Sequence, residues 1–197
     1  MDLKNKKYLI FKNFLSEEVR KLLENHCKIT HRNNKDQFSS SDDVTDGDSY
    51  FYADPIMEAL LVTKGPEIEK KLGVELLPTY SFWRMYTKYS RLVKHSDRPS
   101  CEYSVSVFIG GDQTHKWPFI ADGNKINIDP GDAIFYKGCE IKHWREEFLG
   151  DYQAQLFLHY VDKNGPNANC VLDGRLMLGR VNKNTFFLER YYFNNKK

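Results

Sequence analysis

Apolar residues recur at a helical period in the first third of the chain and at a strand period further on. Residues 7–14 alternate and predict an opening strand. Ser16 then precedes two glutamates, which is typical of a helix N-cap with an acidic first turn. We therefore predict a helix from about Glu17 to Cys27. Its apolar face, which we place in the core, is formed by Leu15, Val19, Leu22 and Leu23.

The next stretch, from Thr30 to Ser49, is polar and rich in turn-forming residues, so we predict a solvated loop. Its aspartates raise the possibility of a calcium site. Their spacing lacks the terminal glutamate of an EF-hand loop, which argues against such a site. The aspartates concerned are Asp42, Asp43, Asp46 and Asp48. A second helix is predicted over residues 54–71, with a break at Gly65 and Pro66 because proline lacks the amide donor.

From residue 76 onward the pattern changes to short β-branched and aromatic runs that glycine, proline and aspartate interrupt. We predict strands over residues 76–89, 103–110, 117–120, 125–128 and 133–136. Regular strand spacing with turn signals indicates a closed or folded-over β architecture. The chain is therefore predicted to be mainly β with flanking helices.

The 197 residues are most simply one domain. In this domain a strand and helices (residues 1–75) flank a β core over about residues 76–162. The C-terminal segment, residues 163–197, begins as a loop, and its aromatic end is open between a last strand, a lid and an interaction surface. No run of eighteen apolar residues and no secretory signal is found, so we expect a cytoplasmic protein with no membrane partner and with reduced cysteines.

The candidate chemistry starts at His95 and Asp97, which lie two residues apart on an extended segment. Side chains alternate across a strand, so both point to the same side and can reach one metal ion. Together they supply two ligands of the 2-His-1-carboxylate triad that holds non-haem Fe(II). The third ligand must be a later histidine. His143 follows a turn and a short apolar strand and is our first choice, whereas His159 is the reserve and His115 lies in a polar loop.

Two features near this triplet bear on its surroundings. Ser104 and Ser106 share one face of the following strand, which suits a polar cofactor pocket. Arg98 and Glu102 could pair as support for Asp97 or could simply be surface charges, and the sequence leaves both readings open.

A resemblance to a known family rests on a series of motifs: RMYTKYSRLVKHSDRPSCEYSVSVFIG, then WPF, PGDAIFYKG, HWREEF and QAQLFLHYVD. This series resembles the Fe(II)/2-oxoglutarate-dependent dioxygenases, and within them the prolyl-4-hydroxylase-like branch, over roughly residues 8–162. The resemblance implies a double-stranded β-helix (a jelly-roll, cupin-like barrel) in which His95, Asp97 and His143 hold Fe(II). It also implies 2-oxoglutarate as cosubstrate, O2 as oxidant, and a hydrogen bond from Tyr86 to a 2-oxoglutarate carboxylate.

One position departs from that family, whose members usually carry a basic residue nine to twelve positions after the distal histidine to bind the far carboxylate of 2-oxoglutarate. Residues 152–155 of this chain contain no cation. An unpaired carboxylate in a dry pocket is costly, so another basic residue must substitute. Arg145 is our first choice, because it would project to the same side of a strand as His143. Arg84, which shares a face with Tyr86, is our second.

The expected activity is hydroxylation of an unidentified peptide or small molecule, with peptidyl proline suggested by the resemblance alone. An oxidative nucleic-acid demethylase is one alternative. It would need a basic groove with stacking aromatic residues, and a net charge of +2 gives no such signal. A non-catalytic, metal-binding β-barrel interaction module is the other alternative. The complete triad argues against it, whereas the missing basic residue argues slightly for it.

Overall fold

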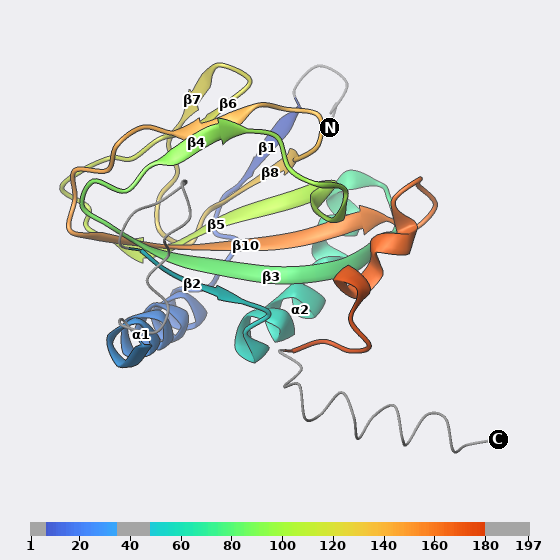
Figure 1. The fold of residues 1–197 in the computed structure, drawn as a ribbon, viewed down its shortest axis with the longest axis horizontal. Coiled ribbons are helices and arrows are strands. Elements are labelled where there is room, and N and C mark those ends of the chain that lie inside the picture. Colours follow the sequence, from blue (N-terminus) through green and yellow to red (C-terminus); the bar gives the residue numbers. More distant parts are fainter. Residues whose placement is uncertain (1–6, 35–47, 180–197) are drawn as a thin grey trace.

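The computed structural model describes residues 7–34 and 48–179. Within these residues antiparallel strands form a larger and a smaller sheet, which lie one above the other in Figure 1. Across the larger sheet the order is β1 (Tyr8–Phe11), β8 (Ala133–Lys137), β5 (Tyr103–Gly111), β10 (Tyr152–Asp162), β3 (Leu76–Thr87) and β2 (Ser49–Tyr52). Across the smaller sheet it is β4 (Leu92–His95), β9 (His143–Arg145), β6 (Phe119–Ala121) and β7 (Asn124–Ile126). The prediction of a mainly β protein with flanking helices is confirmed.

The first helix, α1 (Glu17–Asn34), extends beyond the predicted end at Cys27. No glycine or proline interrupts residues 28–34, and His31 near the C-terminal end interacts favourably with the helix dipole. His31 Nδ1 also lies 2.7 Å from Ser49 Oγ, which ties the last turn of the helix to the start of β2. Residues 30–34 and Ser49, which were predicted in the loop, therefore belong to α1 and β2.

Asp48 is the member of the aspartate group that the structure describes, whereas Asp42, Asp43 and Asp46 lie outside the described residues. The Asp48 side chain is buried. Its Oδ1 accepts hydrogen bonds from the Thr87 amide, at 3.0 Å, and from the Ser90 hydroxyl. These bonds attach the beginning of β2 to the turn that follows β3.

The second helix, α2 (Pro55–Leu72), runs through Pro66, and the predicted break is wrong. A proline inside a helix removes one amide donor and crowds the preceding turn. The buried residues Leu61 and Ile68 hold the helix in the core on both sides of Pro66, and the Tyr160 hydroxyl on β10 adds a hydrogen bond to the Leu61 carbonyl at 2.7 Å. The helix ends at Gly73, whose φ of 73° is the left-handed conformation that glycine adopts without strain.

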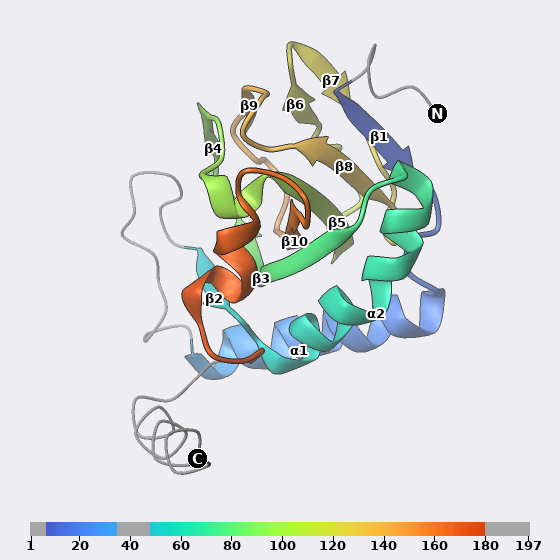
Figure 2. The same ribbon diagram turned by 90° about the vertical axis from the view of Figure 1, so that its right-hand side faces the viewer.

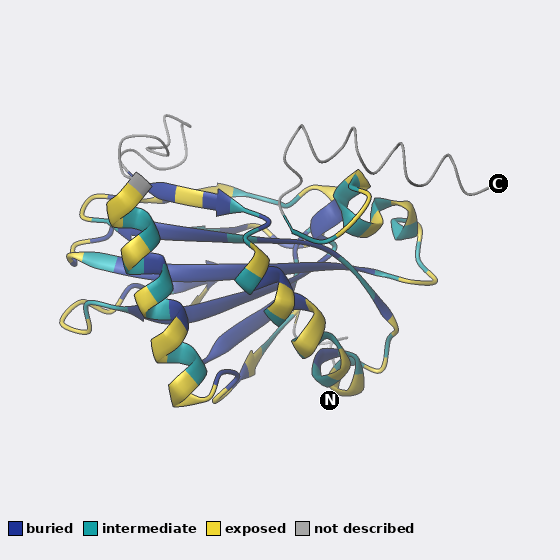
Figure 3. Ribbon diagram, turned by 90° about the horizontal axis from the view of Figure 1, so that it is seen from below, coloured by how far each residue is buried: buried dark blue, intermediate teal, exposed yellow. Residues whose placement is uncertain are grey.

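Both helices pack against the larger sheet on the face opposite the smaller sheet (Figure 2). Figure 3 shows their exposed residues turned outward and the buried strands behind them. The main core lies in this layer, where Trp83 is fully buried and stacks on Phe51 at 4.2 Å between ring centroids. A smaller core that includes Phe119 and Tyr136 brings β6 and β8 together.

The segment after β10 was predicted as a loop, and it contains the short 3-10 turns of η2 (Ala168–Gly174). A similar turn, η1 (Pro99–Cys101), precedes β5. All four cysteines are free thiols, as expected. No helix in the described part of the chain is long and apolar enough to cross a membrane. The aromatic C-terminal end lies outside the described residues.

Substitution of Leu61 by alanine should lower the free energy of unfolding by about 2 to 5 kcal/mol. The Leu61 side chain is fully buried between α2 and the larger sheet, so its truncation would leave a cavity. The neighbouring Val62 is 48% exposed, so Val62→Ala should change stability by less than about 0.5 kcal/mol. Urea denaturation of both variants measures the difference. Equal losses would contradict the assignment of the helix face.

Candidate metal centre

Three candidate ligands come together on the smaller sheet. His95 is the last residue of β4, and His143 is the first residue of β9. The two strands are antiparallel neighbours, and their register places His95 directly opposite His143. Asp97 follows β4 by two residues, so its side chain returns to the same side as that of His95.

The ligand atoms of these residues converge on one oxygen. Asp97 Oδ1 lies 3.4 Å from His95 Nε2 and 3.3 Å from His143 Nε2. The ligand atoms of all three side chains lie within 4.8 Å of one another, and the two imidazole rings are 4.3 Å apart. Two imidazole nitrogens and one carboxylate oxygen at these separations suit a divalent transition metal.

The other ring nitrogens fix which atoms face the centre. His95 Nδ1 lies 2.7 Å from the Val93 carbonyl, and His143 Nδ1 lies 3.4 Å from the Ile141 carbonyl. A carbonyl oxygen only accepts, so Nδ1 carries the hydrogen in both rings. Each Nε2 therefore takes up a proton or a metal ion on the side that faces Asp97. Such a backbone contact is the usual way in which a metal-binding histidine is oriented.

Asp97 is held by its surroundings in the ionised form. Its amide donates to the Gly138 carbonyl at 2.9 Å, and the Ser104 hydroxyl donates to Oδ2 at 3.0 Å. Burial alone would raise the pKa of Asp97, but contacts with His143 and His95 hold the pKa of this carboxyl well below its usual range. A metal ligand must be deprotonated, so the site is prepared for a cation.

Gly138 is a residue of this centre that sequence reasoning missed. A Cβ at position 138 would collide with Asp97 Oδ2 and with the Cys101 carbonyl, so no other residue fits without a shift. The signal in the sequence was a glycine at the end of an apolar strand, which often marks a close approach of another chain segment. Ser104, by contrast, belongs to the serine face that the sequence assigned to a polar pocket.

A cavity of about 310 Å3 opens beside the centre, between the two sheets. Tyr86 and Arg84 of β3 line it, as their shared strand face predicted. The Tyr86 ring is fully buried and packs edge-on against Trp117 at 4.8 Å. Further aromatic side chains line it, from Tyr80, Phe82, Tyr136 and Phe157.

Arg145 lies two residues beyond His143, is buried, and borders a second cavity of about 60 Å3. Its guanidinium lies over the Trp117 ring at 4.7 Å, and Nη1 donates to the Trp117 carbonyl. Burial lowers the pKa of Arg145 to about 10, so the group remains charged at neutral pH. Its Nη2 is buried and has no hydrogen-bond partner among residues 7–34 and 48–179. An unpaired buried donor of this kind points to a missing acceptor.

Neutral side chains occupy the β10 positions where the family's basic residue was expected. Gln153 and Gln155 are both buried there. Gln153 Nε2 donates to Gln155 Oε1 at 2.9 Å, and Gln155 Nε2 donates to Ser106 Oγ at 2.8 Å. The two glutamines and Ser106 thus form a series of neutral hydrogen bonds in this part of β10.

The two other candidate histidines have different surroundings. His115 lies in the exposed loop after β5, where Nδ1 is 2.8 Å from the Thr114 hydroxyl. His159 lines the main cavity, and its Nδ1 is 2.9 Å from Ser104 Oγ. Burial lowers the pKa of His159 to about 4, which keeps the ring neutral at physiological pH. With Asp97 and Cys101 it forms a second group of possible ligands, and this group shares the carboxylate of the first.

No model of a known protein family matches the sequence, and no curated protein sequence matches it either. Solved structures do match. A prolyl-4-hydroxylase from Pseudomonas putida has 16% identity and a TM-score of 0.64, over 82% of this chain and 95% of that one. A viral collagen prolyl hydroxylase from Paramecium bursaria Chlorella virus-1 has 12% identity and a TM-score of 0.61, over 81% and 98%. The chain has the fold of the 2-oxoglutarate- and Fe(II)-dependent oxygenases.

A third similar structure shows how widely this oxygenase fold is used. The non-haem α-ketoglutarate-dependent epimerase SnoN from nogalamycin biosynthesis has 10% identity and a TM-score of 0.69, over 91% of this chain and 88% of that one. At these identities the comparison establishes the fold and confirms the sequence resemblance at that level. The reaction must be argued from the site of this chain.

His143→Ala should weaken Co(II) binding by roughly 100-fold or more, since loss of an outer-shell partner alone costs about 10- to 100-fold. His115→Ala is the matched control and should bind Co(II) like the parent, because His115 lies in the exposed loop. Calorimetric titration with Co(II) measures both. If His159→Ala lost the affinity and His143→Ala kept it, the second group of ligands would be the metal site.

Proposed function

We propose that the chain is an Fe(II)- and 2-oxoglutarate-dependent oxygenase of the prolyl-4-hydroxylase-like branch. The observation that carries the proposal is the convergence of His95, Asp97 and His143 beside a cavity in an oxygenase fold. Similar structures support it through the ligands that they contain. The viral hydroxylase has 2-oxoglutarate bound, EctD has iron, and HygX has nickel and 2-oxoglutarate. The two sheets would be the layers of a double-stranded β-helix, within a single domain over residues 1–197.

The donor set fits Fe(II), because two neutral imidazoles and one carboxylate leave further coordination positions open. His95 and His143 would bind through Nε2 and Asp97 through Oδ1, with the backbone carbonyls at each Nδ1 keeping the rings oriented. Bound Fe(II) would supply the redox chemistry in which O2 converts 2-oxoglutarate to succinate and CO2 and the substrate C–H to C–OH.

The cosubstrate also has a fitting environment in this chain. Arg145 Nη2 is a buried donor that lacks an acceptor among the described residues, and a carboxylate would supply one. Tyr86 packs with Trp117 and Phe148 in a buried aromatic cluster, so its hydroxyl can orient a carboxylate where water is excluded. Arg84 lines the cavity from β3 and is the alternative cation.

The size and lining of the cavity limit the substrate. A volume of about 310 Å3 must hold the cosubstrate and the reacting group, so a side chain or a small molecule fits better than a large folded surface. The aromatic wall favours an apolar or flat group beside the metal. We propose hydroxylation of a small molecule or of a peptide side chain, with peptidyl proline as one candidate.

The proposal is tested by incubating the protein with Fe(II), O2 and 2-oxoglutarate and measuring succinate. We expect slow, iron-dependent succinate formation even without a primary substrate, and we expect Asp97→Ala to abolish it because the proposed triad loses its carboxylate. His115→Ala serves as the control. Metal binding without succinate formation would instead support the non-catalytic interaction module.

Arg145→Ala should raise the half-saturating concentration of 2-oxoglutarate far more than it weakens metal binding. A carboxylate left unpaired in a buried site costs about 2 to 5 kcal/mol, which is roughly 30-fold or more in affinity. Arg84→Ala is the comparison, and it would show the larger loss if the carboxylate points toward β3. The measurement is a 2-oxoglutarate titration with the metal saturating, and an unchanged value for Arg145→Ala would remove Arg145 from the site.

A further inference from the structure

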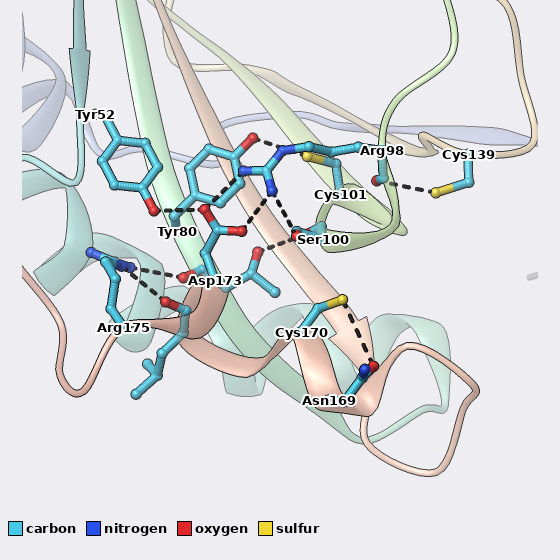
Figure 4. Close-up of polar contacts among 12 residues, drawn as sticks. Tyr52, Tyr80, Arg98, Ser100, Cys101, Cys139, Asn169, Cys170, Asp173 and Arg175 are labelled. Carbon is cyan, nitrogen blue, oxygen red and sulfur yellow. Dashed lines mark hydrogen bonds and ion pairs between the residues drawn. The ribbon is translucent and has the colours of Figure 1, made fainter.

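The residue after the candidate ligand Asp97 is tied to the C-terminal part of the described chain. Arg98 Nη1 donates to Asp173 Oδ1 at 2.7 Å, and Nη2 donates to Asp173 Oδ2 at 2.8 Å (Figure 4). The Tyr52 hydroxyl also donates to Asp173 Oδ2, at 2.6 Å. Burial alone would raise the pKa of Asp173, but the bonds from Arg98 and Tyr52 lower it to about 2, so the carboxylate is ionised. The sequence left open whether Arg98 pairs with Glu102 or is a surface charge, and in the structure its partner is instead Asp173.

Arg98 joins this carboxylate to the wall of the metal cavity. Its guanidinium lies over the Tyr80 ring at 4.8 Å, and Tyr80 lines the cavity beside the metal centre. Nη1 also donates to the Ser100 hydroxyl at 2.9 Å. The chain is therefore fixed on both sides of the Asp97–Arg98 peptide. Before it, the Asp97 amide donates to the Gly138 carbonyl, and after it, the Arg98 side chain makes the contacts described above.

Asp173 is itself anchored by Arg175. Arg175 donates to both carboxylate oxygens of Glu58 on α2, at 2.7 and 3.0 Å, and to the Thr79 carbonyl on β3 at 2.8 Å. Glu58 is 1% exposed, so this ion pair is buried at its acidic end. Two ion pairs, Glu58–Arg175 and Asp173–Arg98, thus attach residues 173–175 to α2 on one side and to the residue beside Asp97 on the other.

The backbone of the segment adopts a conformation that serves this contact. Leu172 and Asp173 have φ values of 53° and 54°, in the left-handed region that residues other than glycine rarely occupy. Such a conformation persists where the surroundings determine it, and here the Arg175 guanidinium holds the Leu172 carbonyl at 2.9 Å. The strained backbone at Leu172 and Asp173 directs the Asp173 carboxylate toward Arg98, which indicates that this carboxylate has a role other than packing.

We propose that Asp173 is a positioning residue for the metal centre, which acts through Arg98 on Asp97. The inference rests on the proposed metal site. It adds to that site a residue that lies 76 positions after Asp97 in the sequence. Asp173 does not touch the metal ligands. It fixes the guanidinium, and the guanidinium fixes the direction in which the Asp97 backbone leaves β4.

The test is Co(II) binding by the full chain carrying Asp173→Asn, which keeps the shape of the side chain and removes its charge. We expect roughly 5- to 10-fold weaker Co(II) binding and a changed Co(II) d–d absorption spectrum. A direct outer-shell partner changes metal affinity by about 10- to 100-fold, and Asp173 acts from one residue further away. Glu75→Gln is the matched control. Glu75 is an exposed acid that pairs with Lys163 at 3.4 Å, at the start of the same C-terminal segment, and its loss should change neither quantity.

A double-mutant cycle with Arg98→Ala separates positioning from simple stability. If Asp173 acts through Arg98, the double variant should bind Co(II) no more weakly than Arg98→Ala alone. If Asp173→Asn lowers the melting temperature but leaves Co(II) affinity and spectrum like those of the parent, Asp173 is only structural and the inference is overturned. If the parent itself binds no Co(II), the proposed metal site fails first, which is a different result.

Discussion

The ionised carboxylate of Asp97 is the constraint on which the centre depends. A buried carboxylate is costly unless nearby groups satisfy it, so each neighbour of Asp97 is restricted. Position 138 must be glycine to admit the carboxylate, and position 104 supplies a hydroxyl to one of its oxygens. The register of β4 on β9 then brings two imidazoles to the other oxygen. The contacts that stabilise the charge are the same contacts that prepare a cation site.

Arg145, the buried cation two residues after His143, has surroundings of the opposite kind. Asp97 is surrounded by hydrogen-bond partners, whereas Arg145 lies between aromatic rings with one nitrogen unpaired among the described residues. Aromatic faces attract a guanidinium but leave its in-plane donors unused. Within residues 7–34 and 48–179, Arg145 therefore has a buried donor without an acceptor.

Periodicity predicted the parts of the fold that local sequence determines. The strands of the core and the shared side of His95 and Asp97 follow from a period of two, and they required no knowledge of tertiary contacts. The errors lie where distant residues decide the outcome. α2 continues through Pro66 while Leu61 and Ile68 pack in the main core, and α1 continues to a contact with Ser49. Asp173 could not be foreseen because its partner Arg98 is far away in sequence and its own backbone conformation is rare.

Placing the cation on β9 has a geometric consequence for the proposed reaction. If the basic residue lay on β10, its distance from the metal would depend on how the two sheets pack. Arg145 and His143 belong to one short strand, and residues two apart on a strand are separated by roughly 6.6 Å. The distance between a metal ligand and the carboxylate anchor is then set by strand geometry. Under the proposed function, movements between the sheets would alter the substrate cavity more than they alter the spacing of metal and cosubstrate, because β9 carries both contacts.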